Sequence, residues 1–206
     1  MNWKGFKDYQ TTIEIDLKKD LETLWNNLDK DARWGVKKAE KEYLIFEESE
    51  DWDTFYEMYK NTLERGKVET KEKGELQKLA AKLFVIKKEE KIIAGAAIKI
   101  QDRIVKLYLN ASEKEFLKFQ PNNCLYWNIL KWSKENGFEI FDLGGYQENA
   151  RKGDKLYEIN RFKQRWGGEI KRINIYSKNF LWIIGRKLIR NSRILWELNN
   201  KIRKRC

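Results

Sequence analysis

The sequence predicts a mixed α/β (α+β) fold, in which helices flank a mixed central sheet and a basic amphipathic helix follows at the C-terminal end. Three observations support this. Strand-like segments cluster at 84–112, and a helical segment and the strand 138–145 come after them. Hydrophobic residues make up 41% and aromatic residues 14% of the chain, which is enough to form a core. This composition argues against a disordered chain, although 36% of the residues are charged. From Leu181 on, apolar residues recur at helical spacing among cations.

Periodicity and capping residues justify the individual elements. Alternating isoleucines predict a strand at 11–17, and a helical repeat follows with Asp20 as N-cap and a break expected at Gly35. Ser49 or Asp51 can cap the next long helix. The remaining patterns predict, in order, a strand at 42–48, helices at 49–66 and 74–83, a hairpin at 84–100 turning at Glu89-Glu90, a strand at 103–112, a helix at 123–136 opened by Pro121-Asn122, and a strand at 138–145.

Charge divides the 206 residues unevenly. The net charge is +11, and residues 178–206 hold nine Lys/Arg against the single acid Glu197, so about +8 of it lies in this tail. We therefore predict one domain at 1–177 and a basic amphipathic helix at 178–206. Such a tail favours an anionic partner: nucleic acid, a phosphorylated precursor or anionic lipid.

Several classes of site are excluded by composition. The chain has no histidine, which removes Ser-His-Asp and Cys-His catalysis and the usual zinc and iron ligand sets. Its two cysteines, Cys124 and Cys206, have no metal-binding spacing, and we expect no metal and no disulfide. The first residues lack a signal-peptide core, and the longest apolar run is too short to span a bilayer. We expect a cytoplasmic protein, with membrane association through the tail left open.

The stretch "FDLGG" (141–145, after Phe138) predicts a strand that ends in a turn. Asp142 falls near the carboxyl end of this strand, where open sheets place ligands. Gly144 and Gly145 permit a turn with positive φ and leave backbone N–H groups uncovered. Asp142 is a candidate catalytic carboxylate, although it could equally cap backbone amides.

A resemblance to a known family rests on "FDLGG" followed by "RFKQRWGG" (161–168), together with "FYEMYKNTLERG" and "LYLNAS" in the same order. This arrangement resembles the Fem-type branch of the GNAT-like acyltransferases, over most of residues 11–170. Those enzymes use aminoacyl-tRNA to add amino acids to the peptide stem of a cell-wall precursor. They usually have two GNAT-like domains, and this chain resembles the second, so a second GNAT-like partner domain or a homodimer is possible.

The resemblance implies a catalytic role for Lys163, which aligns with a family lysine at the reacting ester. There it would stabilise developing negative charge or hold the phosphates of the donor. If Phe162 points into the core of an extended segment, Lys163 lies on the other side with Arg161 and Arg165. Such a row suits phosphates and base stacking, and we count Phe162, Arg161 and Arg165 as candidate substrate-binding residues.

Two further substrate-binding candidates come from the same resemblance. Arg65 closes the helix 49–66 and aligns with an arginine that contacts the precursor, although it could instead interact with the helix dipole. Tyr108 lies one residue away from a family tyrosine that aligns better with Leu109, and on a regular strand it would point to the opposite face.

The donor is expected to be something other than acetyl-CoA. GNAT enzymes that use CoA usually hold its pyrophosphate on a glycine-rich loop before a helix. Residues 112–124 fill this position and contain no glycine. We expect no bound cofactor, aminoacyl-tRNA as the donor and a peptidoglycan precursor, which could be lipid-linked, as the acceptor. The alternatives are an acyl-CoA N-acyltransferase and a non-catalytic RNA-binding or membrane-binding relative.

The tail leaves three interpretations open. Leu181, Ile184, Leu188, Leu195 and Leu198 form an apolar stripe whose other faces are basic. The stripe could pack on the domain with its cations in solvent. It could lie on an anionic membrane with its tryptophans at the interface. Or its cations could hold the backbone of tRNA.

Overall fold

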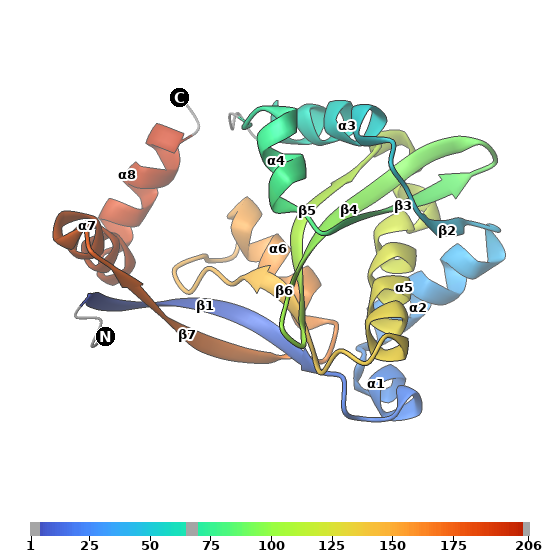
Figure 1. Cartoon of the computed structure of the whole chain (residues 1–206), viewed down its shortest axis with the longest axis horizontal. Coiled ribbons are helices and arrows are strands. Elements are labelled where there is room, and N and C mark those ends of the chain that lie inside the picture. Colours follow the sequence, from blue (N-terminus) through green and yellow to red (C-terminus); the bar gives the residue numbers. More distant parts are fainter. Residues whose placement is uncertain (1–4, 65–69, 204–206) are drawn as a thin grey trace.

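The computed structural model describes residues 5–64 and 70–203 of the chain. It confirms the predicted mixed α/β fold: one seven-stranded sheet, in the order β2-β3-β4-β5-β6-β1-β7, carries helices on both faces (Figure 1). The strands are β1 (Phe6–Asp16), β2 (Ile45–Glu48), β3 (Lys82–Lys88), β4 (Lys91–Gln101), β5 (Ile104–Ser112), β6 (Ile140–Gly145) and β7 (Glu169–Ser177). The helices are α1 (Leu21–Asn27), α2 (Lys30–Lys41), α3 (Trp52–Glu64), α4 (Lys73–Leu79), the 3-10 helix η1 (Lys114–Phe119), α5 (Pro121–Glu135), α6 (Lys155–Gln164), α7 (Phe180–Asn191) and α8 (Arg193–Arg203).

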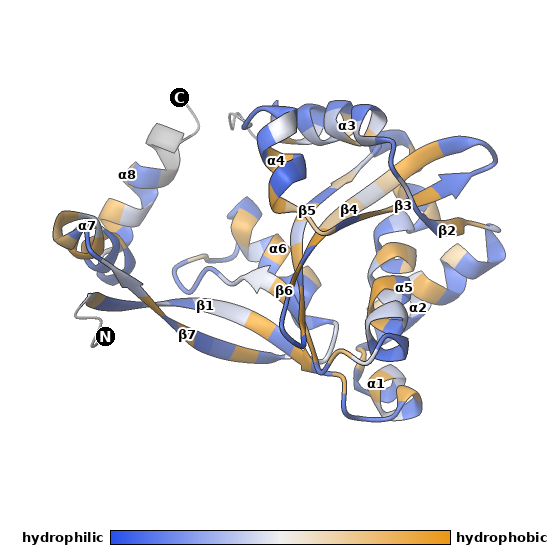
Figure 2. Cartoon of the chain, in the orientation of Figure 1, coloured by the Kyte–Doolittle hydropathy of each residue, from blue (hydrophilic) through white to orange (hydrophobic). Residues whose placement is uncertain are grey.

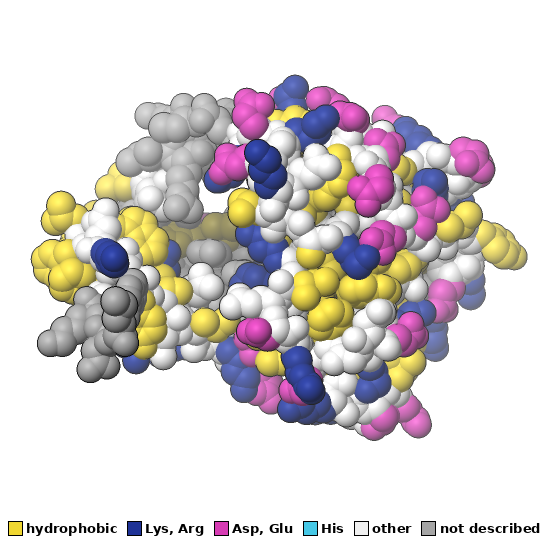
Figure 3. Space-filling model, in the orientation of Figure 1, with side chains coloured by type: hydrophobic (Ala, Val, Ile, Leu, Met, Phe, Trp, Pro, Cys, Tyr) yellow, Lys and Arg dark blue, Asp and Glu magenta, His cyan; other side chains and the backbone are white. Residues whose placement is uncertain are grey.

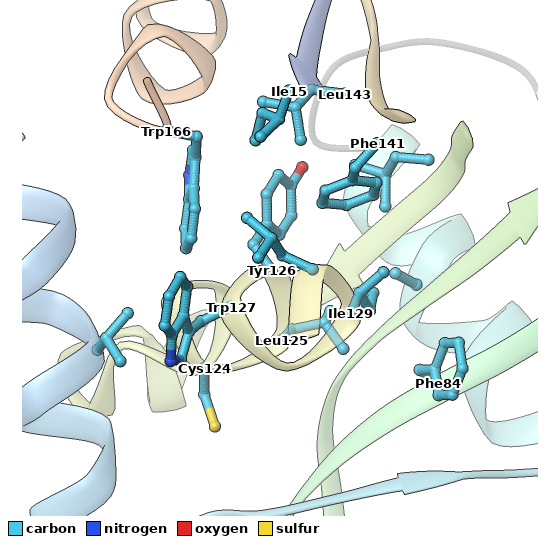
Figure 4. Close-up of a cluster of buried hydrophobic side chains, with 14 of the residues drawn as sticks. Ile15, Phe84, Cys124, Leu125, Tyr126, Trp127, Ile129, Phe141, Leu143 and Trp166 are labelled. Carbon is cyan, nitrogen blue, oxygen red and sulfur yellow. The ribbon is translucent and has the colours of Figure 1, made fainter. Parts of the chain in front are cut away.

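Two apolar clusters hold the helices on the sheet. The larger packs α1, α2 and α5 against one face, with Leu125 and Ile129 of α5 fully buried. In Figure 4 the ring of Tyr126 lies among Trp166, Ile15 and Phe141, so α5, β1 and β6 meet here. The smaller cluster packs α3 and α4 on the other face, through Phe55 and Leu76. Figure 2 shows the matching concentration of apolar residues in the middle of the sheet.

Strands β5 and β6 are parallel, whereas the other neighbouring strands in the sheet are antiparallel. Parallel neighbours need a long crossover, which η1 and α5 supply. Among the described residues, registered pairs between β5 and β6 end at Lys106 and Asp142, although β5 continues to Ser112. The two strands therefore separate at their carboxyl ends, where ligands bind in open sheets.

The helical prediction around Gly35 is wrong in one respect. The break lies at Leu28-Asp29, where the Asp29 side chain accepts from Ala32 N–H and caps α2, and α2 runs through Gly35. A Cβ on Gly35 would lie 2.3 Å from Asn123 Nδ2, so this glycine allows α2 to approach α5 closely. The caps predicted from Asp20 and Asp51 are confirmed by their bonds to Thr23 N–H and Thr54 N–H.

The tail contains the predicted amphipathic helix, but as two helices instead of one. Strand β7 occupies residues before it, and Ser192 separates α7 from α8. The apolar repeat lacks a residue at Asn191, which is where α7 ends. In Figure 1 both helices extend beyond the end of the β1–β7 ribbon, away from α1. Among the described residues, no helix is both long and apolar enough to cross a bilayer.

Candidate functional site

The separation of β5 and β6 is bordered by a charged pair. Lys106 stands opposite Asp142 at their last registered pair, and its Nζ lies 2.6 Å from Asp142 Oδ2. The Asp142 side chain is 2% exposed and accepts two further hydrogen bonds, from Thr12 Oγ1 and, at 2.7 Å, from Gly144 N–H. Asp142 therefore ties three strands together at the point where the site opens.

The turn predicted at Gly144 is present. Gly144 has φ +77°, and a Cβ there would lie 3.3 Å from Leu107 O and 3.7 Å from Lys163 Nζ. A side chain at this position would be strained and would crowd Lys163. Gly145 is exposed, and its carbonyl accepts a hydrogen bond from Lys163 at 2.9 Å. The two glycines thus provide the surface on which the Lys163 ammonium rests.

Lys163 belongs to the last turn of α6, and it is half-buried. Burial of its ammonium lowers its pKa to about 8; Asp142 opposes this shift and Lys106 adds to it. At neutral pH most molecules therefore keep Lys163 charged, while the cation stays poorly solvated. A desolvated cation beside an open strand end is suited to stabilise an oxyanion.

The extended conformation expected for "RFKQRWGG" is wrong, because residues 155–164 form α6. In a helix, side chains two positions apart point to nearly opposite sides. The expected row of Arg161, Lys163 and Arg165 therefore does not form. Arg161 is exposed and lies 3.7 Å from Glu158. Arg165 lies 3.1 Å from Asp31, and its carbonyl accepts from Asp29 N–H, so it anchors the start of α2. The structure brings neither arginine to Lys163.

The aromatic and glycine residues of the same stretch fix α6 in place. Phe162 and Trp166 pack against Tyr126 with ring centroids 5.2 and 5.4 Å apart, as part of the larger core cluster. Gly167 has φ +70°, and a Cβ on it would lie 2.5 Å from Asn27 O. One on Gly168 would lie 2.7 Å from Ile13 Cγ2. Phe162 precedes Lys163 in α6, and its ring packs into the core. This packing holds the last turn of α6, and with it the backbone of Lys163, in place.

The expected face of Tyr108 needs a correction. A β-bulge lies between Ala97 and Ile98, which pair with Leu109 and Leu107 and leave Tyr108 between them. Tyr108 and Leu109 therefore both contact the smaller core cluster, instead of pointing to opposite faces. The Tyr108 ring carries Lys99 Nζ 3.7 Å from its centroid. Arg65, the remaining candidate, lies outside the described residues.

A row of charges that the sequence analysis missed crosses the sheet beside Asp142. Glu14 is registered opposite Asp142 on β1, and Lys99 opposite Lys106 on β4. Burial and the neighbouring Asp142 raise the pKa of Glu14, whereas Lys171 and Lys106 oppose this rise. Thr12, Glu14 and Lys106 share a strand face with Asp142. The polar residues alternating with isoleucine in "TTIEI" were a signal for them, but strand order cannot be read from one sequence.

A pocket of about 350 Å³ opens from this charged group towards the tail. Its floor includes Thr12, Lys106 and Gly145, so it reaches the carboxyl end of β6. The remaining wall residues are Tyr9, Gln10, Thr11, Tyr146, Gln147, Glu148, Asn149, Arg186, Ile189, Arg190, Trp196 and Asn199. Figure 3 shows a hollow between the tail and the body of the molecule, with Lys and Arg side chains at its edge. Asp142 and Lys163 are not among these lining residues, and Gly145, whose carbonyl accepts from Lys163, connects the pocket to them.

Helix α7 closes this pocket through a buried ion pair. Asp8 of β1 has its side chain fully buried, and it lies 2.7 Å from Arg190 Nη2 and 3.1 Å from Arg186 Nε. Burial alone would raise the pKa of Asp8, but hydrogen bonds from Arg190, Tyr9 N–H and Arg186 outweigh it and hold the pKa below its ordinary value. The Asn149 side chain donates to Arg190 O, so the loop after β6 is tied to α7 as well.

Within the described residues, no group of three or more His, Cys, Asp or Glu side chains could hold a metal ion. Cys124 is buried in α5, where burial raises the pKa of its thiol to about 11. A thiol of this kind stays protonated at neutral pH and is a poor nucleophile. The chemistry that the described site offers is therefore that of lysine, carboxylate and backbone groups.

Comparison with known proteins places these features in a family. Residues 25–164 match the model described as acetyltransferase (GNAT) domain. A stretch of 57 residues is 32% identical to the lipid II:glycine glycyltransferase of Staphylococcus haemolyticus, covering 28% of this chain and 14% of that protein. The sequence match to this glycyltransferase thus spans only a small part of its length.

Solved structures show the same fold. FemX superposes with a TM-score of 0.71 at 18% identity, over 84% of this chain and 63% of its own. L-PGS from Bacillus licheniformis superposes with a TM-score of 0.63 at 18% identity, over 91% of this chain and 66% of its own. The glycyltransferase match and the FemX fold confirm the predicted resemblance to Fem-type enzymes. The GNAT match covers well over half of the residues and includes Lys106, Asp142 and Lys163, so the chain belongs to the acetyltransferase (GNAT) domain family.

Proposed function

We propose that this protein transfers an aminoacyl group from aminoacyl-tRNA to an amine of a peptidoglycan precursor, in the cytoplasm. The observation that carries the proposal is the half-buried ammonium of Lys163, held at Gly145 O beside the separated ends of β5 and β6. The glycyltransferase relative, whose name gives lipid II as its acceptor, supports this class of acceptor. The match covers 14% of that relative, so both the acceptor and the aminoacyl-tRNA donor of this protein are proposed.

The reaction joins an amine nitrogen to the carbonyl carbon of an ester and breaks the bond from that carbon to the tRNA oxygen. Negative charge develops on the carbonyl oxygen as the amine attacks. Lys163 would donate a hydrogen bond to this oxygen, because its cation is already desolvated and positioned. When the intermediate collapses, the tRNA oxygen leaves and takes up the proton that the amine gives up.

We assign Asp142 a positioning role. Its oxygens accept from Thr12, Gly144 N–H and Lys106, so it fixes the turn on which Lys163 rests and raises the pKa of Lys163. Lys106 lies on the pocket floor and would hold anionic groups of the donor or acceptor. Asp142 thus acts through Lys163 and Lys106 and does not itself touch the reacting atoms.

The start of α5 supports a donor other than CoA. Pro121, the first residue of α5, has no N–H group to offer a phosphate. The backbone of Gln120, directly before it, is in the left-handed conformation with φ 60°. The Asn122 side chain is bonded to Asn110 and Ser112 at the end of β5. Side chains therefore occupy the region where a glycine loop would present amides to a pyrophosphate.

The test measures aminoacyl transfer by the purified full chain, from labelled aminoacyl-tRNA to lipid II, with labelled acetyl-CoA as the parallel donor. We expect product from aminoacyl-tRNA, and a fall in rate of about 10²–10³ in Lys163→Met. Lys163→Arg keeps the charge and should retain part of the rate. Product from acetyl-CoA alone would establish the acyl-CoA alternative, and no product from any aminoacyl-tRNA would overturn the proposal.

A further inference from the structure

Helix α7 turns two of its cations, Arg186 and Arg190, towards the protein and two of its leucines towards solvent. Ile183 is buried, and Arg186 and Arg190 reach Asp8 on β1. On the outer side, Leu181 is 77% and Leu188 54% exposed. A helix on a water-soluble surface normally has the reverse orientation. The first interpretation of the tail, with an apolar stripe packed inwards and cations in solvent, therefore does not describe α7.

The exposed apolar residues extend along α7 to its first turn and onto β1. Phe180 and Trp182 lie at the start of the helix, and Phe6 of β1 packs on Phe180 with ring centroids 4.6 Å apart. We call this group the apolar tail surface; its exposed members are Phe6, Phe180, Leu181, Trp182 and Leu188. Figure 3 shows hydrophobic side chains gathered over α7 at this end of the molecule. Contiguous exposed apolar residues of this kind mark an interaction surface.

Cations border the apolar tail surface. Lys178 and Lys187 are exposed, the first directly before α7 and the second within it. The one acid in the tail, Glu197, lies 2.5 Å from Arg193 and is thereby neutralised. A two-fold contact between copies through this surface would bring the lysines of both copies together, and their like charges would repel one another. An anionic lipid surface would instead attract every one of them.

We propose that the apolar tail surface binds peripherally to an anionic lipid bilayer. Leu181, Leu188, Phe180 and Trp182 would enter the boundary between headgroups and acyl chains, with α7 in the plane of the membrane. Lys178 and Lys187 would meet the lipid phosphates. Trp182 carries the Arg186 guanidinium 4.9 Å from its ring, and such amphipathic rings favour this depth.

This orientation also places the pocket at the bilayer. Arg186, Ile189 and Arg190 line the pocket from the inner face of α7, while Leu181 and Leu188 lie on its outer face. An acceptor amine carried on a lipid would then be presented beside Lys106 and Gly145. This consequence rests on the proposed function, whereas lipid binding itself does not.

The experiment is flotation of the full chain with vesicles of phosphatidylcholine alone and of phosphatidylcholine mixed equally with phosphatidylglycerol, without any substrate. We expect binding to the anionic vesicles and, at low salt, a loss of about tenfold or more in Lys178→Gln/Lys187→Gln; this loss should shrink as added salt screens the lysines of the wild type. Leu181→Gln/Leu188→Gln should also bind at least about tenfold more weakly, because both leucines are lost from the contact. Trp34→Gln, on the exposed Trp34 of α2 (56% exposed), is the matched control and should bind like wild type.

Each outcome decides the proposal. Wild type that stays with the soluble fraction, or leucine variants that bind as well as wild type, would overturn it. A wild-type dimer that becomes monomeric in Leu181→Gln/Leu188→Gln, without vesicle binding, would assign the surface to a second copy. Unchanged circular dichroism shows that the variants fold. Because no substrate is present, lipid binding can be established even if aminoacyl transfer is not.

Discussion

Lys106 and Asp142 face each other at the last registered pair between β5 and β6, with Nζ and Oδ2 2.6 Å apart. This pair has opposite effects on a third residue, since Asp142 raises the pKa of Lys163 and Lys106 lowers it. Burial is the main cause that lowers the pKa of Lys163 to about 8, and the pair adjusts this pKa in opposite directions.

The first prediction concerns the pH dependence of transfer. If Lys163 acts as an ammonium, kcat/KM should decline as the pH rises through about 8, where Lys163 loses its proton. Lys106→Met should move this decline to higher pH and Asp142→Asn to lower pH, because each removes one of the two opposing influences. The acceptor amine titrates equally in all variants and serves as the internal reference. A rate that increases through pH 8, with a midpoint that moves in Lys106→Met and Asp142→Asn, would show that neutral Lys163 acts as a base instead.

The second prediction concerns the different contributions of Asp142 and Glu14 to the free energy of unfolding. Asp142→Asn leaves Lys106 without its buried partner, and we expect a loss of about 2–3 kcal/mol in the free energy of unfolding, reduced by the partial exposure of Lys106. Glu14→Gln removes a carboxylate whose pKa is raised by burial and by Asp142, so it should be neutral or slightly stabilising at pH 7. Urea titration measures both. Equal effects of the two substitutions would contradict this assignment.

A third prediction tests the glycines after α6. Gly167→Ala combines a left-handed backbone with a Cβ 2.5 Å from Asn27 O, and should cost about 3 kcal/mol. Gly137 has a similar φ, +77°, but no atom within 4 Å of a Cβ, so Gly137→Ala isolates the backbone strain at about 1 kcal/mol. Thermal unfolding of both variants gives the difference. Matching losses would mean that the approach to Asn27 contributes nothing.

The fourth prediction concerns the docking of α7 on β1. Asp8→Asn leaves two arginines near a neutral amide, and opening of α7 should become easier by about 3 kcal/mol. In wild type, the pKa of Asp8 is below its ordinary value of 3.8, so its contribution is complete above pH 3.8 and is lost as the pH falls further. Hydrogen exchange of the α7 amides measures both effects. Exchange that is unchanged in Asp8→Asn would exclude the ion pair as the main anchor.

The structure brings Asp142, Gly144 and Lys163 together, and their roles stay predictions. The strand period and glycine pair of "FDLGG" indicated the first two, whereas the resemblance to Fem-type enzymes indicated Lys163. The helix that carries Lys163 was missed: Leu156, Ile159 and Phe162 recur at helical spacing in α6, but only Phe162 was considered for burial. The strand 169–177 was missed too, because β7 is an edge strand whose side chains are largely exposed and leave a weak apolar pattern.

Long-range relations explain the other differences. The bulge at Tyr108 depends on the pairing of β5 with β4, and the contact of Gly35 with Asn123 depends on how two helices cross. Glu14 and Lys106 join Asp142 only because β1 and β5 are its neighbours in the sheet. Packing of the leucines on the domain was one of three interpretations left open for the tail; the ion pairs of Arg186 and Arg190 with the buried Asp8 instead turn the cationic face of α7 inwards.

The reversal of α7 implies reciprocal coupling between two events. The same 12 residues of α7 border the pocket with one face and expose leucines on the other. Anything that stabilises α7 on β1 therefore favours both binding in the pocket and binding to lipid. By thermodynamic reciprocity, a molecule that fills the pocket and holds α7 in place would strengthen attachment to lipid by the same factor by which lipid strengthens its own binding. A 24.9 kDa chain would thereby respond cooperatively to substrate and surface through one short helix.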